Sequence, residues 1–459
     1  MNPAQFDGSK ADRLDEDHPA SHPPVLAGQG AATIVPRPDH NISRANISRN
    51  ALKVLYRLRE GGFQAFLVGG SVRDLLLGVT PKDFDIATDA HPDQVAELFR
   101  NCRLIGRRFR LAHVRFGREI IEVATFRAGG EEAHDDRVHD DAGRILRDNV
   151  YGSIDEDVWR RDFTSNALYY NIADFSIWDF TGGFQDVHDR VLRLIGDPET
   201  RYREDPVRML RAVRFAAKLG FSIAPETAAP IARLAPLLVE VPPARLFDEI
   251  LKLFHGGHGL RVFELLGQYG LFGQLFPHTE ASLAGPHGES LEKLIRLALA
   301  NTDARVAEEL PVTPTFLLAV LLWGPIRERA ALLLEEGGSD VDALAGGTTE
   351  VVLEQLERVS IPRRFSGPLR EMLALQPRFS QRRGVRAMRL LENKRFRAAY
   401  DFLVLRAECG EVDPDLVEWW TEVQEMDAET RRKEMGLRRG GGKPADGRRR
   451  RSRRRSRAD

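Results

Sequence analysis

The sequence is poor in cysteine and in long apolar runs. Its two cysteines, Cys102 and Cys409, lie far apart; they suit a reducing cytoplasm and exclude a cysteine zinc site. The longest strongly apolar run, residues 315–323, has nine residues, too few to span a bilayer. The N-terminus is polar and acidic, unlike a secretory signal. We therefore expect a cytoplasmic protein without a membrane span.

The sequence also has no overall excess of positive or negative charge, because 67 Lys and Arg against 68 Asp and Glu give a net charge of −1. The two kinds of charge are unevenly distributed along the chain. Residues 431–459 hold 14 basic and 3 acidic residues, a charge of +11, which leaves −12 on the other 430. An acidic body with a basic tail indicates a polyanionic partner. The alternative is a solubilising end without a partner.

The length of 459 residues and the apolar content of 42% predict two or three domains. The first 40 residues lack periodicity and are expected to be disordered. From about Pro198 the apolar pattern becomes helical. The expected fold class is α+β, with a small mixed-sheet head, an all-helical body and a disordered basic tail. The expected divisions are 1–40, 41–175, 176–290, 291–430 and 431–459.

The head begins with a glycine turn between a strand and a helix. Apolar patterns predict a helix at 48–60 and a strand at 65–69. Gly69 and Gly70 break this strand, and Ser71 is expected to cap a short helix that runs to Leu77. Such a turn exposes backbone N–H groups to a polyphosphate, with Arg73 beside them. Further strands are expected at 83–87, 111–116 and 119–126.

Asp83 and Asp85 are one residue apart on the expected second strand. Alternate residues of a strand point to one face, so both carboxylates can hold a divalent metal over the phosphate-binding turn. A lone Gly-Gly turn or a lone Asp-x-Asp is usually structural. Together, within 25 residues, the two motifs indicate metal-assisted nucleotidyl transfer.

The run Phe66–Thr88 resembles the class II nucleotidyltransferases of the DNA polymerase β superfamily. This group contains bacterial poly(A) polymerases and CCA-adding tRNA nucleotidyltransferases. The resemblance continues through Ile121–Arg127, Arg160–Ala167 and Glu204–Arg211, and covers residues 45–290 closely. It implies that 41–175 is the catalytic head, that 176–290 selects the nucleotide and binds RNA, and that 291–430 is a helical C-terminal body.

Three stretches resemble the poly(A) polymerase branch more than the CCA-adding branch. They are Gly106–Val114, Gly143–Gly152 and Ala167–Tyr170. The resemblance implies an adenylyltransferase that adds AMP from ATP to single-stranded RNA 3′ ends and releases pyrophosphate, with Mg²⁺ or else Mn²⁺ as cofactor. It implies a role in mRNA processing and decay, with no DNA partner and with the RNA-decay machinery as a partner. The rivals are a CCA-adding enzyme and a catalytically silent RNA-binding module.

Two carboxylates seldom hold two metal ions, so a third acidic residue is expected near Asp83 and Asp85. Glu122 lies on the expected strand 119–126 and can face the pair. Asp162 lies in a block where the resemblance implies a functional carboxylate; its alternative role is a helix N-terminal charge. We place Asp162 first as an active-site residue and keep Glu122 as a direct ligand. Arg161 resembles the family's nucleotide-contacting arginine.

A third motif opens a helix at Asp205, the expected N-cap, with Pro206 at the first helical position. Arg208, Arg211 and Arg214 then recur along one face, near the positive helix end, where something anionic should offset them. The alternative is a solvated basic stripe. The resemblance implies that Asp205 and Arg208 pair with the incoming base and that the later arginines reach the phosphates.

Two further regions carry open alternatives. Residues 378–400 interleave arginines and aromatics, which suits a single-stranded 3′ end or an ordinary amphipathic helix. Residues 129–141 are acidic, and His134, Asp135 and His139 could suggest a metal cluster. Nothing rigid flanks these three residues, so a solvated loop is the favoured interpretation.

Overall fold

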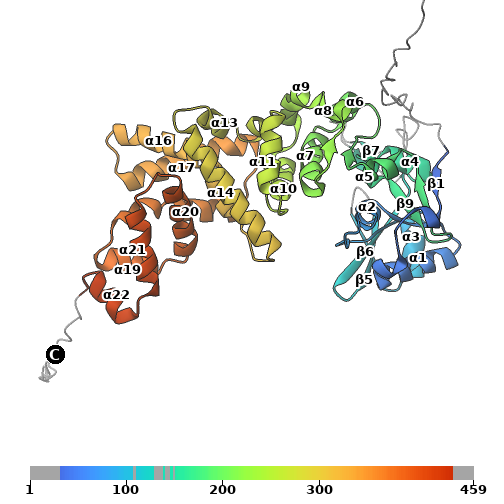
Figure 1. Cartoon of the computed structure of the whole chain (residues 1–459), viewed down its shortest axis with the longest axis horizontal. Helices are drawn as coiled ribbons and strands as arrows, with labels where there is room; N and C mark the ends of the chain where they lie inside the picture. Colours follow the sequence, from blue (N-terminus) through green and yellow to red (C-terminus); the bar gives the residue numbers. More distant parts are fainter. Residues whose placement is uncertain (1–30, 107–109, 129–137, 140–144, 148–149, 438–459) are drawn as a thin grey trace, which may run out of the picture. The chain divides into compact units, whose positions relative to one another are not determined.

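The computed structural model describes residues 31–106, 110–128, 138–139, 145–147 and 150–437. These residues form two compact units (Figure 1). The first contains the described residues up to Val187 together with Leu194–Asp197. The second contains His188–Arg193 and the described residues from Pro198 onward. The two units are described separately below.

A mixed eight-stranded sheet forms the core of the first unit. Its strand order is β1-β10-β9-β2-β3-β6-β5-β4. Only β3 and β6 pair in parallel; the other neighbours are antiparallel. The strands are β1 (Thr33–Val35), β2 (Ala65–Val68), β3 (Asp85–Thr88), β4 (Cys102–Ile105), β5 (Leu111–Phe116), β6 (Glu119–Thr125), β9 (Leu168–Asn171) and β10 (Ile177–Asp179). A separate pair joins β7 (Val138–His139) to β8 (Ile145–Arg147).

Helices cover the two faces of this sheet differently. The alternation of β5 and β6 directs Ala112, Val114, Ile121 and Val123 to one face, where they form a core with Leu55 of α1. The other face is covered only in part, where Val158 of α4 joins a cluster beneath β2 and β9. The helices are α1 (Arg49–Glu60), α2 (Gly70–Leu76), α3 (Pro92–Leu98), α4 (Ile154–Trp159) and α5 (Gly183–His188).

The predicted helix and strands of the head are confirmed, with local corrections. Ser48 caps α1 through the backbone N–H groups of Asn50 and Ala51. Ser71 is not a cap; it lies inside α2 and donates to the Val68 carbonyl. The strand expected from Asp83 begins at Asp85. The N-terminal segment expected to be disordered up to residue 40 contains β1, which pairs with β10.

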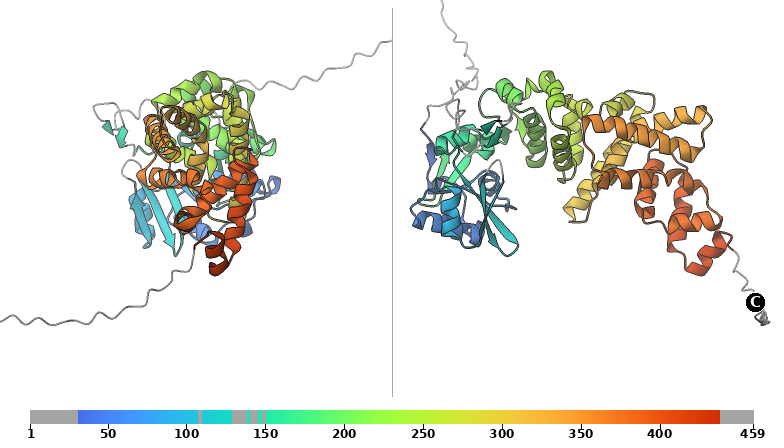
Figure 2. Two further views of the ribbon diagram at one scale, coloured as in Figure 1. Left: turned by 90° about the vertical axis from the view of Figure 1, so that its left-hand side faces the viewer. Right: turned by 180° about the vertical axis from the view of Figure 1, so that it is seen from behind.

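Helices build the second unit. A short parallel pair, β11 (Val191–Leu192) with β12 (Ser222–Ile223), lies at its start. α16 and α17 pack side by side as a hairpin (Figure 2). The helices are α6 (Pro198–Glu204), α7 (Val207–Leu219), α8 (Pro225–Ala228), α9 (Ile231–Leu234), α10 (Pro243–Phe254), α11 (Gly259–Gln268), α12 (Phe272–Leu275), α13 (Pro277–Leu283), α14 (Gly288–Ala307), α15 (Pro314–Leu321), α16 (Trp323–Glu335), α17 (Asp340–Arg358), α18 (Arg363–Leu373), α19 (Gly384–Leu391), α20 (Phe396–Glu408), α21 (Pro414–Glu425) and α22 (Ala428–Glu434).

Two expected division points fall inside helices, and a third separates two paired strands of one sheet. Residue 175 lies between β9 and β10, neighbours in one sheet. Residue 290 lies within α14. The tail expected from residue 431 begins too early, because α22 runs to Glu434 and the buried Met435 follows it. Residues 438–459, His134 and Asp135 lie outside the described residues. No described helix is long and apolar enough to cross a membrane.

Candidate active site

Acidic side chains meet where β3 and β6 lie next to each other. Asp85 and Glu122 are direct partners in the parallel register of these strands, so their side chains share one face of the sheet. Asp83 lies two residues before Asp85, in the segment that leads into β3. All three residues line a cavity of about 590 Å³, together with His113 and Arg118 among others.

The pKa of Asp85 reflects the surrounding protein and the negative charges of the acidic residues around it. The surrounding protein and the negative charges of Glu122 and Asp83 raise the pKa of Asp85 to about 6, while Arg161 opposes the rise. His113 Nε2 lies 3.2 Å from Glu122 Oε1. A cation at the same place would relieve the repulsion that Asp85 feels from the neighbouring carboxylates.

The glycine turn lies beside these carboxylates. Val68, the last residue of β2, is the antiparallel partner of Asp85, so the chain enters the turn at the same end of the sheet. Gly69 has φ 71° and ψ −138°, a conformation that side-chain-bearing residues avoid. This conformation starts α2 at Gly70 directly after the strand. The N-terminal backbone N–H groups of such a helix favour anions.

Arg73 lies within this turn and not at its surface. It is only 2% exposed, and its guanidinium donates to Asp74 Oδ1 at 2.9 and 2.6 Å and to Asn166 Oδ1. A Cβ atom at Gly70 would approach Arg73 Nη2 to 3.3 Å. Gly70 therefore leaves room for a buried arginine that fixes α2 against the segment at Asn166.

Arg161 is the positively charged residue that lowers the pKa of Asp85. Its Nε donates to Tyr169 Oη at 2.8 Å, and its Nη2 lies 3.1 Å from Asp157 Oδ2. Burial opposes its charge, but Tyr169 and Asp157 raise the pKa of Arg161 above its usual value. A Cβ atom at Gly69 would lie 3.5 Å from Arg161 Nη1. A fixed positive charge thus lies next to the glycine turn, where a phosphate would be held.

Asp162 does not join the carboxylates that perturb Asp85. Its Oδ1 accepts from the backbone N–H of Phe163 at 2.9 Å and from Asn166 Nδ2 at 3.4 Å. These contacts start the 3₁₀ turn Thr164–Asn166, which matches the alternative helix-terminal role. The strand register therefore favours Glu122 over Asp162 as the third carboxylate beside Asp85.

Sequence reasoning missed the residues that support this site. Asp157 and Tyr169 orient Arg161, and Tyr169 Oη donates to Asp157 Oδ2 at 2.6 Å. Asn166 connects Asp162 to Arg73. Asn166 stands in the Arg160–Ala167 block, but its partner Arg73 is 93 residues away. No local pattern in the sequence indicates contacts over such a separation.

In the second unit, Asp205 lies at the start of α7. Its Oδ1 accepts from the Val207 backbone N–H at 3.2 Å, which is the expected capping contact, although the helix begins at Val207 and Pro206 takes the N-cap position. Its Oδ2 accepts from Arg245 Nη2 at 2.7 Å. The carboxylate therefore has one oxygen on the helix and one on an exposed arginine.

Each of the three arginines of α7 contacts an anionic or aromatic side chain. Arg208 Nη1 donates to Glu204 Oε2 at 2.8 Å and to the Arg201 carbonyl at 2.7 Å. Arg214 Nε donates at 2.7 Å to Glu249, which is buried. Arg211 lies 5.4 Å from the Phe215 ring centroid. The charge offset expected at this end of the helix is thus partly supplied by the protein itself.

The aromatic side chains of residues 378–400 belong to the core. Phe379, Phe396 and Tyr400 are 0%, 5% and 7% exposed, and Phe396 stacks on Tyr400 with centroids 6.0 Å apart. The amphipathic-helix alternative is therefore confirmed for these rings. They cannot stack on a single-stranded RNA without unfolding this part of the unit.

The carboxylates fit a metal that also binds substrate. Across the described ranges, no three His, Cys, Asp or Glu side chains form a ready-made metal-binding group. Magnesium does not require such a group, since it binds through one or two carboxylates, water and substrate phosphates. Asp85 beside Glu122, with its raised pKa, supplies this donor chemistry.

A mixed sheet that places paired carboxylates beside a glycine turn defines the class of the protein, a nucleotidyltransferase. Family models match three parts of the chain. The poly A polymerase head domain matches residues 65–193. The probable RNA and SrmB-binding site of polymerase A matches residues 220–283, and the polymerase A arginine-rich C-terminus matches residues 336–457.

The chain belongs to the poly(A) polymerase I family. It is 53% identical over 399 residues to poly(A) polymerase I of Escherichia coli O6:H1, covering 85% of this chain and 86% of the relative. The Haemophilus influenzae protein is 48% identical, covering 85% and 88%. The CCA-adding enzyme of Bacillus subtilis is more distant, at 36% identity over 64% of this chain and 73% of its own.

Solved CCA-adding enzymes share the fold. The Bacillus stearothermophilus CCA-adding enzyme, in complex with CTP, superposes with a TM-score of 0.50 at 26% identity, over 85% of this chain and 88% of its own. A CCA-adding enzyme in apo form II gives a TM-score of 0.56 at 22% identity, over 87% of each chain. The α+β class expected from the sequence, with a mixed-sheet head and a helical body, is confirmed.

Proposed function

We propose that the chain adds AMP from ATP to the 3′ ends of RNA without a template and releases pyrophosphate. The observation that carries this proposal is the register of Asp85 with Glu122, one strand from the glycine turn. Membership of the poly(A) polymerase I family supports adenylate as the product, because the CCA-adding relatives are more distant.

Each group of the head has a proposed task. The N–H groups at Gly69 and Gly70 hold the triphosphate, and Arg161 lies next to that turn. Asp83 and Asp85 hold the metal ions, with Glu122 as the third carboxylate and Asp162 as a positioning residue. When bound, divalent metal neutralises the triphosphate and lowers the pKa of the RNA 3′-hydroxyl. We propose Mg²⁺, with Mn²⁺ as an alternative.

We propose that α7 selects the base. An Asp acceptor beside an Arg donor can match the edge of a base, and Asp205 and Arg208 lie three residues apart, one turn of helix. Their present partners, Arg245 and Glu204, are at least partly exposed, so a nucleotide can replace those contacts at small cost. Arg211 and Arg214 would then reach the phosphates.

The cellular context is also a proposal. We place the enzyme in the cytoplasm, where it would act in mRNA processing and decay and meet the RNA-decay machinery. Residues 41–175 would hold the catalytic groups, 176–290 would select the nucleotide and bind RNA, 291–430 would form a helical body, and the arginine-rich tail beyond α22 would contact RNA. A family model for an RNA-binding site matches within the second of these segments.

The test is a polymerisation assay with generic single-stranded RNA and each nucleoside triphosphate separately. ATP alone should give long A-tails, while CTP, GTP and UTP should give little extension. Asp83→Asn and Asp85→Asn should each abolish transfer and leave RNA binding nearly intact. The proposal is wrong if only a tRNA lacking its 3′ end accepts nucleotides, or if either variant keeps transfer within tenfold of the wild type.

A further inference from the structure

The carboxylate pair continues into a row of polar side chains across the outer strands of the sheet. Glu122 of β6 is the partner of Asp85 on one side and of His113 on the other. His113 in turn is the partner of Arg103 on β4. Residues in direct register share a face, so Arg103, His113, Glu122 and Asp85 form one row from the sheet edge to the cavity.

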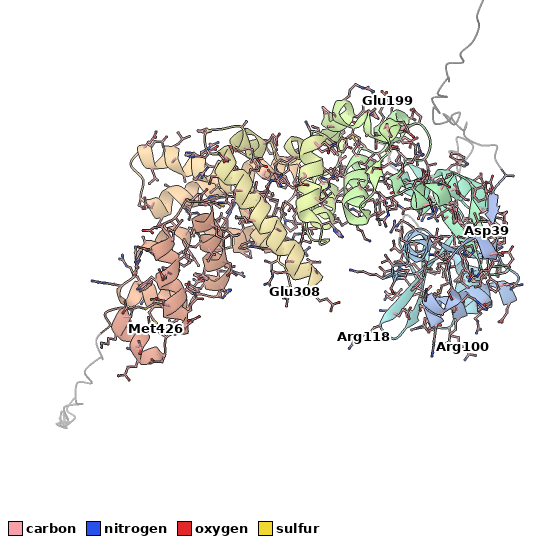
Figure 3. The ribbon with its side chains drawn as sticks, in the orientation of Figure 1. Asp39, Arg100, Arg118, Glu199, Glu308 and Met426 are labelled. Carbon is pink, nitrogen blue, oxygen red and sulfur yellow. The ribbon has the colours of Figure 1, made fainter. Side chains whose placement is uncertain are left out.

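Two more arginines flank this row. Arg115 lies two residues beyond His113 on β5 and therefore on the same face. Arg118 lies in the turn between β5 and β6, where Figure 3 labels it, and lines the cavity. Arg103, Arg115 and Arg118 are all exposed, and none forms an ion pair with a residue in the described ranges.

These arginines do not serve as direct partners of the acidic cluster. Glu122 is approached by His113, and Arg161 is the cation that lowers the pKa of Asp85. Strands are spaced by about 4.8 Å, so Arg103 lies about 14 Å from Asp85 along the row. At such distances exposed charges are largely screened in salt. Arg103 is therefore screened from the carboxylates. Arg115 and Arg118 lie nearer to them but form no ion pair within the described ranges, so the three guanidinium groups remain available to an anionic ligand.

We propose that this face, defined by Arg103, Arg115 and Arg118, binds the phosphates of the last nucleotides of the RNA primer. The inference rests on the proposed function, because a primer must place its 3′-hydroxyl at Asp85, where the row ends. Continuity with the carboxylates and charge complementarity favour single-stranded RNA over an acidic protein. Ile120, the register partner of Arg115, is 36% exposed on this face and offers an apolar contact to a base.

The test compares a triple variant of the full chain, Arg103→Gln, Arg115→Gln and Arg118→Gln, with the wild type. A labelled oligoadenylate is titrated across a salt series without ATP. Each lost phosphate contact to a single strand lowers the slope of log affinity against log salt by about 0.7, so three contacts lower it by about 2. We also expect the KM for the primer to rise, while the KM for ATP and the kcat at saturating RNA change little.

A matched control keeps the net charge equal. Arg49, Arg59 and Arg100 are exposed arginines of the helical side of the head, which packs on the opposite face of the sheet; their triple Gln variant should bind as the wild type does. Figure 3 labels Arg100. The proposal is overturned if the Arg103, Arg115 and Arg118 variant has the same salt slope as the control variant. It is also overturned if that variant raises only the KM for ATP. Because binding is measured without ATP, a wild type that binds but does not elongate contradicts the proposed function alone.

Discussion

Asp85 pairs with Glu122 in the strand register and lines the cavity of the candidate site. Its titration can be measured. Its pKa is raised to about 6 from 3.8 by the surrounding protein and by Glu122 and Asp83. Between these values the folded chain holds a proton that the unfolded chain has released. Folding stability from this group therefore falls as pH rises through that window.

It follows that removing the charge stabilises the metal-free protein above pH 6. Asp85→Asn should raise the Tm at pH 7.5 in the presence of a chelator, and the gain should disappear near pH 4. Scanning calorimetry at several pH values measures this effect. Asp93→Asn, an exposed carboxylate of α3, is the control and should show no such pH-dependent gain. An unchanged or lower Tm for Asp85→Asn at pH 7.5 contradicts the crowding of these carboxylates.

Asp205 permits a second measurement on a single residue. Asp205→Ala should weaken the preference for ATP more than it weakens phosphate binding. A hydrogen bond to a charged group contributes about 1.5–3 kcal/mol, or about 10- to 150-fold in selectivity. The readout is the ratio of kcat/KM for ATP to that for CTP and UTP. Arg245→Gln removes the present partner of Asp205 and should keep the ratio; unchanged ratios in Asp205→Ala exclude α7 as the template.

At the scale of elements, the glycine turn depends on one backbone conformation. Gly69→Ala must place a side chain at φ 71° and ψ −138°, which costs about 1–3 kcal/mol, and should raise the KM for ATP because the turn moves. Gly62 also has positive φ, at 86°, with open space around it. Gly62→Ala should thus lower the free energy of unfolding and leave the KM for ATP unchanged. If both variants keep the KM, the turn does not hold the triphosphate.

The elements that the sequence predicted well are those with a local signal. The strand expected at 111–116 agrees with β5 at both ends, because apolar and polar residues alternate from Ala112 to Phe116 and Gly117 follows. The sequence predicted that Glu122 lies on a strand and can face Asp85, and the register of β3 with β6 places the two residues side by side. The exposed or buried state of Arg73 and of the aromatics near Phe396 could not be predicted, because it depends on contacts with distant segments. β1 was missed because three residues carry too little periodicity.

At the scale of the molecule, the residues with proposed roles divide between the two compact units. The carboxylates and the glycine turn lie in the first unit, whereas Asp205 and Arg208 lie in the second. The sequence predicted each group from its own motif. It could not predict which partners each group has, since Arg245 is 40 residues from Asp205 and Glu249 is 35 from Arg214. Chemistry and base selection can therefore be tested by separate substitutions.

The charge of the whole chain leads to the last prediction. Deleting Arg448–Asp459 removes eight arginines and one aspartate, a change of −7 in net charge. The groups proposed for catalysis lie in the first unit, so addition of a single AMP at saturating RNA should survive the deletion. RNA affinity should fall, and even three lost phosphate contacts should flatten its salt slope by about 2. The measurement is oligoadenylate binding across a salt series, with replacement of the same twelve residues by Gly and Ser as the control for length. Equal slopes in all three proteins would mean that the tail makes no contact with RNA.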